Sequence, residues 1–405
     1  MLYDPTRHEA LDPRPWDEAR ARAAIADIVA GTEARFDAGS YWPLHPLDRE
    51  GDGPDMVETP LYHGAAGVVW ALHYLQDCGA VRLSRDYLAG VGHLLAANRG
   101  WLDAQGLAGE RASWLMGDTP ILMMALAREP GDTRHTQALH ERIAGNIEHP
   151  ARELMWGAPG TLLAALFLHE RSGDPSWAAL FRATADTLWR QLAWSEEHGC
   201  AYWTQELYGR RSSYLDAVHG FIAAAVPLIR GRHLLDDDRW EEWRRCIAST
   251  VRRTADLEGT QANWRPQLFG TQREADKKLL QFCHGAPGFV ICLAGFPGEE
   301  LDDLLLAAGE TVWAAGPLAK GSNLCHGTGG NGYALLVLYQ RTGDPRWLER
   351  ARAFAMHGIH QVERDAAHYG QGRYSLWTGD PGFAIYLWDC LRAEADFPTL
   401  DVFQR

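Results

Sequence analysis

One short glycine motif recurs seven times along the sequence, and this repetition constrains the fold more than any other feature. In each copy a glycine opens an apolar run, often with a second glycine inside its first turn. The leading glycines are Gly64, Gly117, Gly157, Gly220, Gly285, Gly327 and Gly379, at separations of 53, 40, 63, 65, 42 and 52 residues. A constant motif at irregular spacing indicates one structural unit joined by loops of variable length.

The apolar runs have the length of ordinary globular helices and are apolar nearly all round, which predicts buried helices. Amphipathic, charged segments alternate with them, for example from Pro175 and from Pro345, each preceded by an aspartate. Proline in the first turn after such a residue is typical of a helix start. We therefore expect an all-α fold, an α/α toroid of seven inner and seven outer helices. Short strands are expected only in the long loops.

The glycines themselves predict where a site lies. Glycine permits positive φ and close approach of neighbouring backbone, and helix N-termini present free N–H groups. If the inner helices begin at one end of the toroid, their glycine-rich turns line one mouth, where a site is expected. We expect residues 1–405 to form a single domain, with residues 1–17 as an N-terminal extension.

Composition restricts the partners. The 39 Lys and Arg residues against 53 Asp and Glu give a net charge of −14, which argues against nucleic acid and anionic membranes as partners. The N-terminal segment lacks the apolar core of a signal peptide, and no apolar run is long enough for an integral membrane span. Seven cysteines, an odd number in a large chain, favour thiols or metal ligands over a disulfide scaffold. We expect a cytoplasmic protein.

Two of the motifs carry Cys-His-Gly, at Cys283-His284-Gly285 and at Cys325-His326-Gly327. Equivalent positions in adjacent repeats should converge on one rim, and thiolate and imidazole are the ligands that zinc prefers. The two pairs supply four candidate ligands, of which a catalytic site would use three and leave one position open. The alternative is that both cysteines are buried as small apolar residues.

The segments QFCHGAPGF, NLCHGTGGNGYALLVLY and YSLWTGDPGFAIYL resemble the lanthionine synthetase C-like family, and the stand-alone LanC-like branch more than the bacterial cyclases. The resemblance implies one zinc ion per chain, held by Cys283, Cys325 and His326, so that His284 is not a ligand. It also implies the reaction, in which a thiol adds to dehydroalanine or dehydrobutyrine in a peptide or protein and forms a thioether.

Further roles follow from the same resemblance. His219 matches a histidine that transfers protons, and Glu153 stands where the cyclases have an aspartate that orients it. His284 is a second acid or base candidate, and Lys277 and Lys278 precede Cys283 where the family carries a basic residue. Lys320 matches a lysine that contacts glutathione in the stand-alone branch. Arg373 and Arg7 are the nearest equivalents of further glutathione contacts, and cations suit the carboxylates of glutathione.

Several functions remain open from the sequence. The thiol is glutathione, as Lys320 and the CHGAPG spelling favour, or a cysteine of the same peptide, which makes the protein a lanthionine-forming cyclase. A non-catalytic regulatory protein that binds zinc and glutathione is a further alternative. A helical-toroid carbohydrate enzyme could use Asp118 and Asp380 as its paired carboxylates, but it leaves the two Cys-His pairs unexplained.

Overall fold

The computed structural model describes residues 1–49, 56–270 and 278–404. Within them, all seven glycine motifs are followed by a buried α-helix, as predicted. Each helix begins one or two residues after its leading glycine, and its first turns are almost entirely buried. These helices are α2 (Ala65–Asp77), α4 (Thr119–Arg128), α6 (Ala158–Ser172), α8 (Phe221–Arg230), α11 (Ala286–Cys292), α13 (Thr328–Thr342) and α15 (Asp380–Arg392).

Amphipathic helices alternate with the buried ones along the chain. Two of them start where the sequence predicts, because Asp174 and Asp344 accept the N–H of the second helical residue and a proline occupies the first position. This set comprises α1 (Glu18–Ala34), α3 (Val91–Ala104), α5 (Thr133–Gly145), α7 (Pro175–Arg190), α9 (Asp237–Thr254), α12 (Asp302–Ala315) and α14 (Pro345–Tyr369).

Strands are confined to three short antiparallel hairpins in the described residues. They are β1 (Ala193–Ser195) with β2 (Cys200–Tyr202), β3 (Gln205–Leu207) with β4 (Arg210–Ser212), and β5 (Ala255–Glu258) with β6 (Gln261–Trp264). The β3–β4 hairpin closes through Tyr208 and Gly209, whose φ angles are 52° and 70°. Positive φ at both central residues is the geometry of a tight two-residue hairpin turn.

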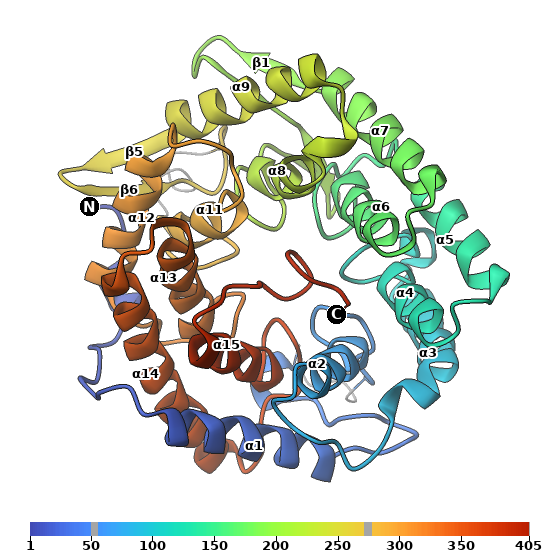
Figure 1. The fold of residues 1–405 in the computed structure, drawn as a ribbon, viewed down its shortest axis with the longest axis vertical. Helices are drawn as coiled ribbons and strands as arrows, with labels where there is room; N and C mark the ends of the chain where they lie inside the picture. The colour runs from blue at the N-terminus through green and yellow to red at the C-terminus, as the bar shows by residue number, and fades with distance from the viewer. Residues whose placement is uncertain (50–55, 271–277, 405) are drawn as a thin grey trace. The chain divides into compact units, whose positions relative to one another are not determined.

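The chain forms two compact units. The first comprises Met1–Thr6, Ala112–Trp114 and Gln137–Ala315, and the second comprises Arg7–Arg111, Leu115–Thr136 and Gly316–Arg405. In the first unit α6 packs on α7, α11 packs on α12, and α8 contacts both α6 and α11 (Figure 1). In the second unit α13 packs on α14, α15 packs on α1, and α4 packs on α3 (Figure 1). A buried helix is thus paired with an amphipathic one, as the alternation in sequence predicts.

The N-terminal segment is bound to the units. Leu2 accepts a hydrogen bond from the Asn263 side chain in the first unit, at 2.7 Å. In the second unit Glu9 donates its N–H to Pro317, and Ala319 donates its N–H to Arg7, each at 3.0 Å. The first α-helix then begins at Glu18, so the predicted boundary of the extension at residue 17 coincides with the start of α1. The single-domain organisation stays a prediction.

The motif glycines are needed mainly for close packing. A Cβ at Gly220 would overlap the backbone nitrogen of Asp216, and one at the second motif glycine Gly382 would overlap the carbonyl of Leu376. Of the seven leading glycines, all within the described residues, only Gly285 has a positive φ, at 104°. Glycine is required either for positive φ or for close approach of neighbouring backbone. Close approach therefore accounts for most of the leading glycines.

No helix among the described residues combines the length and the apolar character that crossing a membrane requires.

Candidate functional site

The motif turns of the second unit lie side by side. In each turn the residue two positions before the leading glycine makes the link. Cys325 donates its N–H to Trp377 at 2.8 Å, Trp377 donates to Tyr62 at 3.1 Å, and Tyr62 donates to Leu115 at 3.0 Å. The sixth, seventh, first and second motifs are thereby joined in that order. Within this unit the turns do gather together, as the motif pattern predicts.

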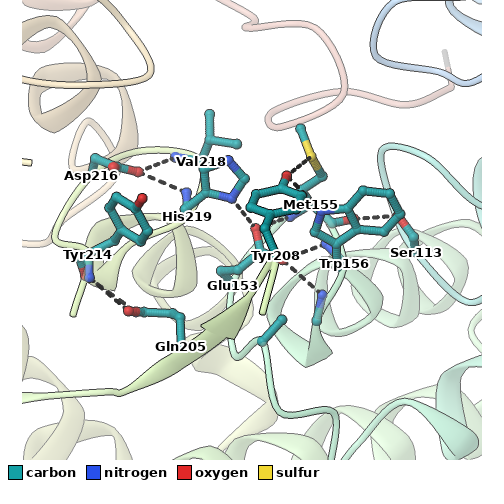
Figure 2. A network of polar contacts seen from close by, with 12 residues as sticks. Ser113, Glu153, Met155, Trp156, Gln205, Tyr208, Tyr214, Asp216, Val218 and His219 are labelled. Atoms are coloured by element: carbon teal, nitrogen blue, oxygen red, sulfur yellow. Dashed lines mark hydrogen bonds and ion pairs between the residues drawn. The ribbon is translucent and has the colours of Figure 1, made fainter. Parts of the chain in front are cut away.

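In the first unit a buried carboxylate links the third motif to the fourth. Glu153 has no solvent exposure. Its Oε1 accepts the N–H of Trp156 at 2.6 Å and of Gly157 at 3.2 Å, and its Oε2 accepts the N–H of Met155 at 2.9 Å. The same Oε2 lies 2.8 Å from Nδ1 of His219 (Figure 2). Glu153 therefore caps its own turn and also holds the imidazole of the next motif.

This contact determines the charge and orientation of His219. Burial opposes protonation of the ring, but the hydrogen bond and the negative charge of Glu153 outweigh it, so that the pKa of His219 is raised above its usual value. Because Nδ1 is occupied by Glu153, Nε2 is the ring nitrogen left for other partners. The orienting contact expected from the family resemblance is present, although the residue is a glutamate and not an aspartate.

A second buried carboxylate lies near the histidine of the next motif, and sequence reasoning missed it. Asp216 is fully buried, and its Oδ1 accepts the N–H of Val218 at 3.1 Å and of His219 at 2.8 Å (Figure 2). Its Oδ2 lies 2.7 Å from Nδ1 of His284 in the fifth motif. Burial opposes protonation of His284, but the charges of Asp216 and Cys283 outweigh it and raise its pKa to about 9. Its position in the sequence could have identified Asp216, because it precedes Gly220 by four residues, just as Glu153 precedes Gly157.

Two tyrosines contact these histidines. The ring of Tyr214 lies 5.7 Å from His219 and 6.4 Å from His284, measured between centroids. The Gln205 side chain on β3 fixes the Tyr214 backbone, accepting its N–H at 2.7 Å and donating to its carbonyl at 3.3 Å (Figure 2). Tyr208, in the hairpin turn, lies 6.1 Å from His219, and its hydroxyl accepts the indole N–H of Trp156 at 3.1 Å. Nothing in the sequence marks either tyrosine.

The expected zinc ligands lie on two motif turns. Cys283 is in the fifth motif, in the first unit, and Cys325 and His326 are in the sixth motif, in the second unit. Two sulfurs and one imidazole nitrogen are a typical donor set of catalytic zinc sites. Within the second unit, the ligand atoms of Glu129, Asp132 and His135 lie within 4.8 Å of one another.

Hydrogen bonds to the two sulfurs agree with thiolate ligands. The amide nitrogen of Gln281 donates to Sγ of Cys283, and the hydroxyl of Tyr62 donates to Sγ of Cys325, each at 2.9 Å. Asn323 accepts the backbone N–H of His326 at 3.0 Å and so fixes the turn that carries it. Donors directed at a metal-binding sulfur stabilise its negative charge and fix its position. The residues present therefore fit a zinc ion.

Two of the cations expected to contact glutathione line one narrow pocket of the second unit. Lys320 is exposed there, and Arg373 lies on the same pocket with His45 and Asp380. The guanidinium of Arg373 is already engaged, because Nε donates to Asp48 Oδ2 at 2.8 Å and Nη2 donates to Asp48 Oδ1. The pKa of the Asp380 carboxyl is raised to about 6, since burial outweighs its hydrogen bond with the backbone of Arg373.

The remaining basic candidates do not line this pocket. The backbone carbonyl of Arg7 accepts the N–H of Ala319, so the chain at Arg7 runs beside the residue that precedes Lys320. Nζ of Lys278 lies 3.5 Å from a carboxylate oxygen of Asp256. Lys277 lies outside the described residues.

Comparison with known proteins identifies the family. The profile of the family described as lanthionine synthetase C-like protein matches residues 55–402. The chain belongs to this family. The match covers both Cys-His-Gly motifs, which the carbohydrate-enzyme alternative leaves unexplained.

Curated relatives match parts of the chain. A Danio rerio protein named glutathione S-transferase LANCL1 is 31% identical over 205 residues, covering 49% of this chain and 47% of the relative. The Arabidopsis thaliana LanC-like protein GCL1 is 37% identical over 139 residues, covering 31% of each chain. The aligned part of this chain thus spans less than half the length of each of these two relatives.

The fold is that of a solved family member. The structure is similar to nisin cyclase with a TM-score of 0.61 and 15% sequence identity, covering 93% of this chain and 98% of the other. This likeness, together with the family match, confirms the predicted fold class, an all-α fold of the α/α toroid type.

Proposed function

We propose that the protein is a zinc-dependent enzyme that adds glutathione to dehydroalanine or dehydrobutyrine residues of peptides or proteins and forms a thioether. The observation that carries the proposal is the pair of Cys-His-Gly motif turns in a LanC-like chain, each with a hydrogen-bond donor on its cysteine sulfur. A zinc ion held by Cys283, Cys325 and His326 would favour the thiolate form of a substrate thiol near neutral pH. One zinc ion per chain is expected.

The reaction needs proton transfer, which the chain's own histidines can supply. The new carbon–sulfur bond forms at the β-carbon, the thiol gives up one proton, and the α-carbon takes one up, so the addition needs no other reagent. Nδ1 of His219 is hydrogen-bonded to the buried Glu153 carboxylate, which leaves Nε2 to accept or donate a proton, and Nδ1 of His284 lies 2.7 Å from Asp216 Oδ2. A positioned proton-transfer group contributes roughly 10²- to 10⁴-fold in rate.

The pocket with Lys320 and Arg373 supports glutathione as the thiol. Its two carboxylates call for cations, and both side chains lie on one pocket of the second unit. The name of the Danio rerio relative points to the same co-substrate. Arg373 would exchange its present partner Asp48 for a ligand carboxylate, while Lys320 is exposed and accessible. The role of Arg7 beside this pocket is part of the same proposal.

The test is adduct formation. With zinc, glutathione and a dehydroalanine peptide, mass spectrometry should show a peptide heavier by one glutathione. Cys325→Ala should lower the rate to that of the uncatalysed reaction, whereas the matched control Cys246→Ala, on α9 outside the Cys-His-Gly motifs, should leave it unchanged. Equal rates for Cys325→Ala and the wild type would contradict the proposal.

Two further outcomes would redirect the proposal. The first uses a dehydrated peptide that contains cysteine. If this peptide loses its thiol without a change in mass, the protein is a lanthionine-forming cyclase. Binding of zinc and glutathione without any rate enhancement would identify a regulatory protein.

A further inference from the structure

Tyr208 carries an exposed ring beside His219 in the first unit. The residue is 69% exposed, and its ring centroid lies 6.1 Å from that of His219 in an edge-to-face arrangement. Its hydroxyl accepts the indole N–H of Trp156 at 3.1 Å (Figure 2). Trp156 precedes the leading glycine of the third motif, as His219 precedes that of the fourth. The ring is therefore held beside two neighbouring motif turns and stays accessible to a ligand.

The turn that carries Tyr208 does not by itself favour a tyrosine. Tyr208 and Gly209 are the central residues of the β3–β4 turn, with φ angles of 52° and 70°. Two-residue turns of this kind prefer asparagine, aspartate or glycine at the first central position, and bulky side chains rarely adopt positive φ. An aromatic residue here therefore points to a role outside the turn, and its contacts with Trp156 and His219 place the ring at the candidate site.

We propose, on the basis of the function proposed above, that Tyr208 is a substrate-binding residue whose ring stacks on the planar dehydroalanine or dehydrobutyrine residue of the peptide. The ring would then recognise the electrophile by its shape.

A dehydro residue differs from a saturated one chiefly in being flat. Its α-carbon is trigonal, and the carbon–carbon double bond is conjugated with the carbonyl group, so that these atoms lie in one plane. An aromatic ring packs closely on such a plane, whereas the tetrahedral α-carbon of serine or alanine holds the backbone away from it. The hydrogen bond from Trp156 restricts the tyrosine ring before the peptide arrives, which lowers the entropic cost of binding. Stacking on Tyr208 would also bring the α-carbon close to His219, the imidazole proposed to transfer its proton.

Substitution by asparagine removes the ring and suits the turn, because asparagine readily adopts positive φ. The experiment uses the full chain with zinc and a labelled, cysteine-free peptide that contains one dehydroalanine, and compares it with the same peptide containing alanine at that position. Fluorescence anisotropy measures binding, and no thiol is added, so that no turnover occurs. The wild type should bind the dehydroalanine peptide about 2- to 10-fold more tightly than the alanine peptide, and Tyr208→Asn should bind both equally.

Two variants serve as matched controls. Tyr208→Phe keeps the ring and should retain the preference for the dehydroalanine peptide. Trp194→Ala removes another exposed aromatic residue of the first unit, on β1, and should leave the preference unchanged. Equal binding of the two peptides by the wild type, an undiminished preference in Tyr208→Asn, or loss of the preference in Tyr208→Phe would overturn the role of Tyr208.

Turnover then separates the role of Tyr208 from the proposed reaction. In Tyr208→Asn the KM for the dehydroalanine peptide should rise about 2- to 10-fold, while the KM for glutathione stays unchanged. If the wild type shows the binding preference and Tyr208→Asn loses it, but no glutathione is added to the peptide, only the proposed reaction is refuted. If glutathione is added and the peptide KM is the same in Tyr208→Asn as in the wild type, only the role of Tyr208 is refuted.

Discussion

Replacing Glu153 by glutamine tests the largest concentration of hydrogen bonds around the candidate site. Four N–H donors face this one buried carboxylate, two at each oxygen. Trp156 and Gly157 donate to Oε1, and Met155 and His219 donate to Oε2. In Glu153→Gln the amide oxygen can serve only one pair of donors. The amide nitrogen is turned towards the other pair. There the N–H of Met155 loses its acceptor, and Nδ1 of His219 can keep its hydrogen bond only by moving its proton to Nε2.

The magnitude follows from this count. One hydrogen bond to the carboxylate, that of Met155, is lost at a site without solvent exposure, and it is worth about 1.5–3 kcal/mol. The free energy of unfolding should therefore fall by about 1.5–3 kcal/mol, a sizeable share of the roughly 5–15 kcal/mol typical of a folded domain. The shorter carboxylate of Glu153→Asp retains the charge and should cost less. An exposed glutamate of the same helix-rich chain, such as Glu349, gives the matched control, expected to change stability by less than about 0.5 kcal/mol on substitution by glutamine.

Denaturant unfolding followed by tryptophan fluorescence measures the stability, and the glutathione adduct assay measures turnover. Because Glu153 holds Nδ1 of His219, kcat should also fall by about 10²- to 10⁴-fold under conditions where the variant is folded. A loss of stability below about 1 kcal/mol would refute the assigned network. A destabilised variant with unchanged kcat would show that Glu153 caps its turn without serving His219.

Four more predictions follow from individual contacts. Metal analysis should find about one zinc ion per wild-type chain and none in the double variant with Cys283→Ala and Cys325→Ala; a full complement of zinc in that variant would exclude this site. Gly382→Ala should lower the unfolding free energy by about 1–3 kcal/mol or more, since the new Cβ overlaps the Leu376 carbonyl; equal denaturation midpoints would contradict the packing. Asp48→Asn should tighten glutathione binding about tenfold by calorimetry, because a ligand carboxylate no longer competes with Asp48 for Arg373; weaker binding would show that Asp48 helps to hold the ligand. Asp389 is buried against the Tyr333 hydroxyl, and burial raises its pKa to about 7. The folded state therefore keeps its proton up to about pH 7, while the unfolded chain releases it near pH 4, so the wild type should lose up to about 4 kcal/mol relative to Asp389→Asn as pH rises between these values; parallel stability curves would refute this.

The sequence was sufficient for what depends on local pattern. The seven buried helices follow the glycine motifs, and the helices at Pro175 and Pro345 start as their capping aspartates predict. The assignment of Cys283, Cys325 and His326 as metal ligands rests on the chemistry of thiolate and imidazole and on the family resemblance, and it stays a prediction. The contacts of Asp216 and Tyr214 could not be predicted in this way, since they depend on the relative rotation of neighbouring turns. The pairing of Arg373 with Asp48 joins residues 325 positions apart and leaves no local signal.

The position four residues before each leading glycine shows how one repeated turn acquires different chemistry. It is Pro60 in the first motif and a polar residue in the other six, which suits a turn whose N–H groups need an acceptor. In four consecutive motifs the side chain does more than this. Glu153 and Asp216 reach the histidine of the next motif, Gln281 donates to the sulfur of Cys283, and Asn323 caps the turn of His326. The residue that stabilises each turn therefore also positions a group of the candidate site, so stability and proposed function are coupled at these four positions. At Ser113, by contrast, the hydroxyl donates to the carbonyl of Met155, a contact between turns that involves no residue of the candidate site.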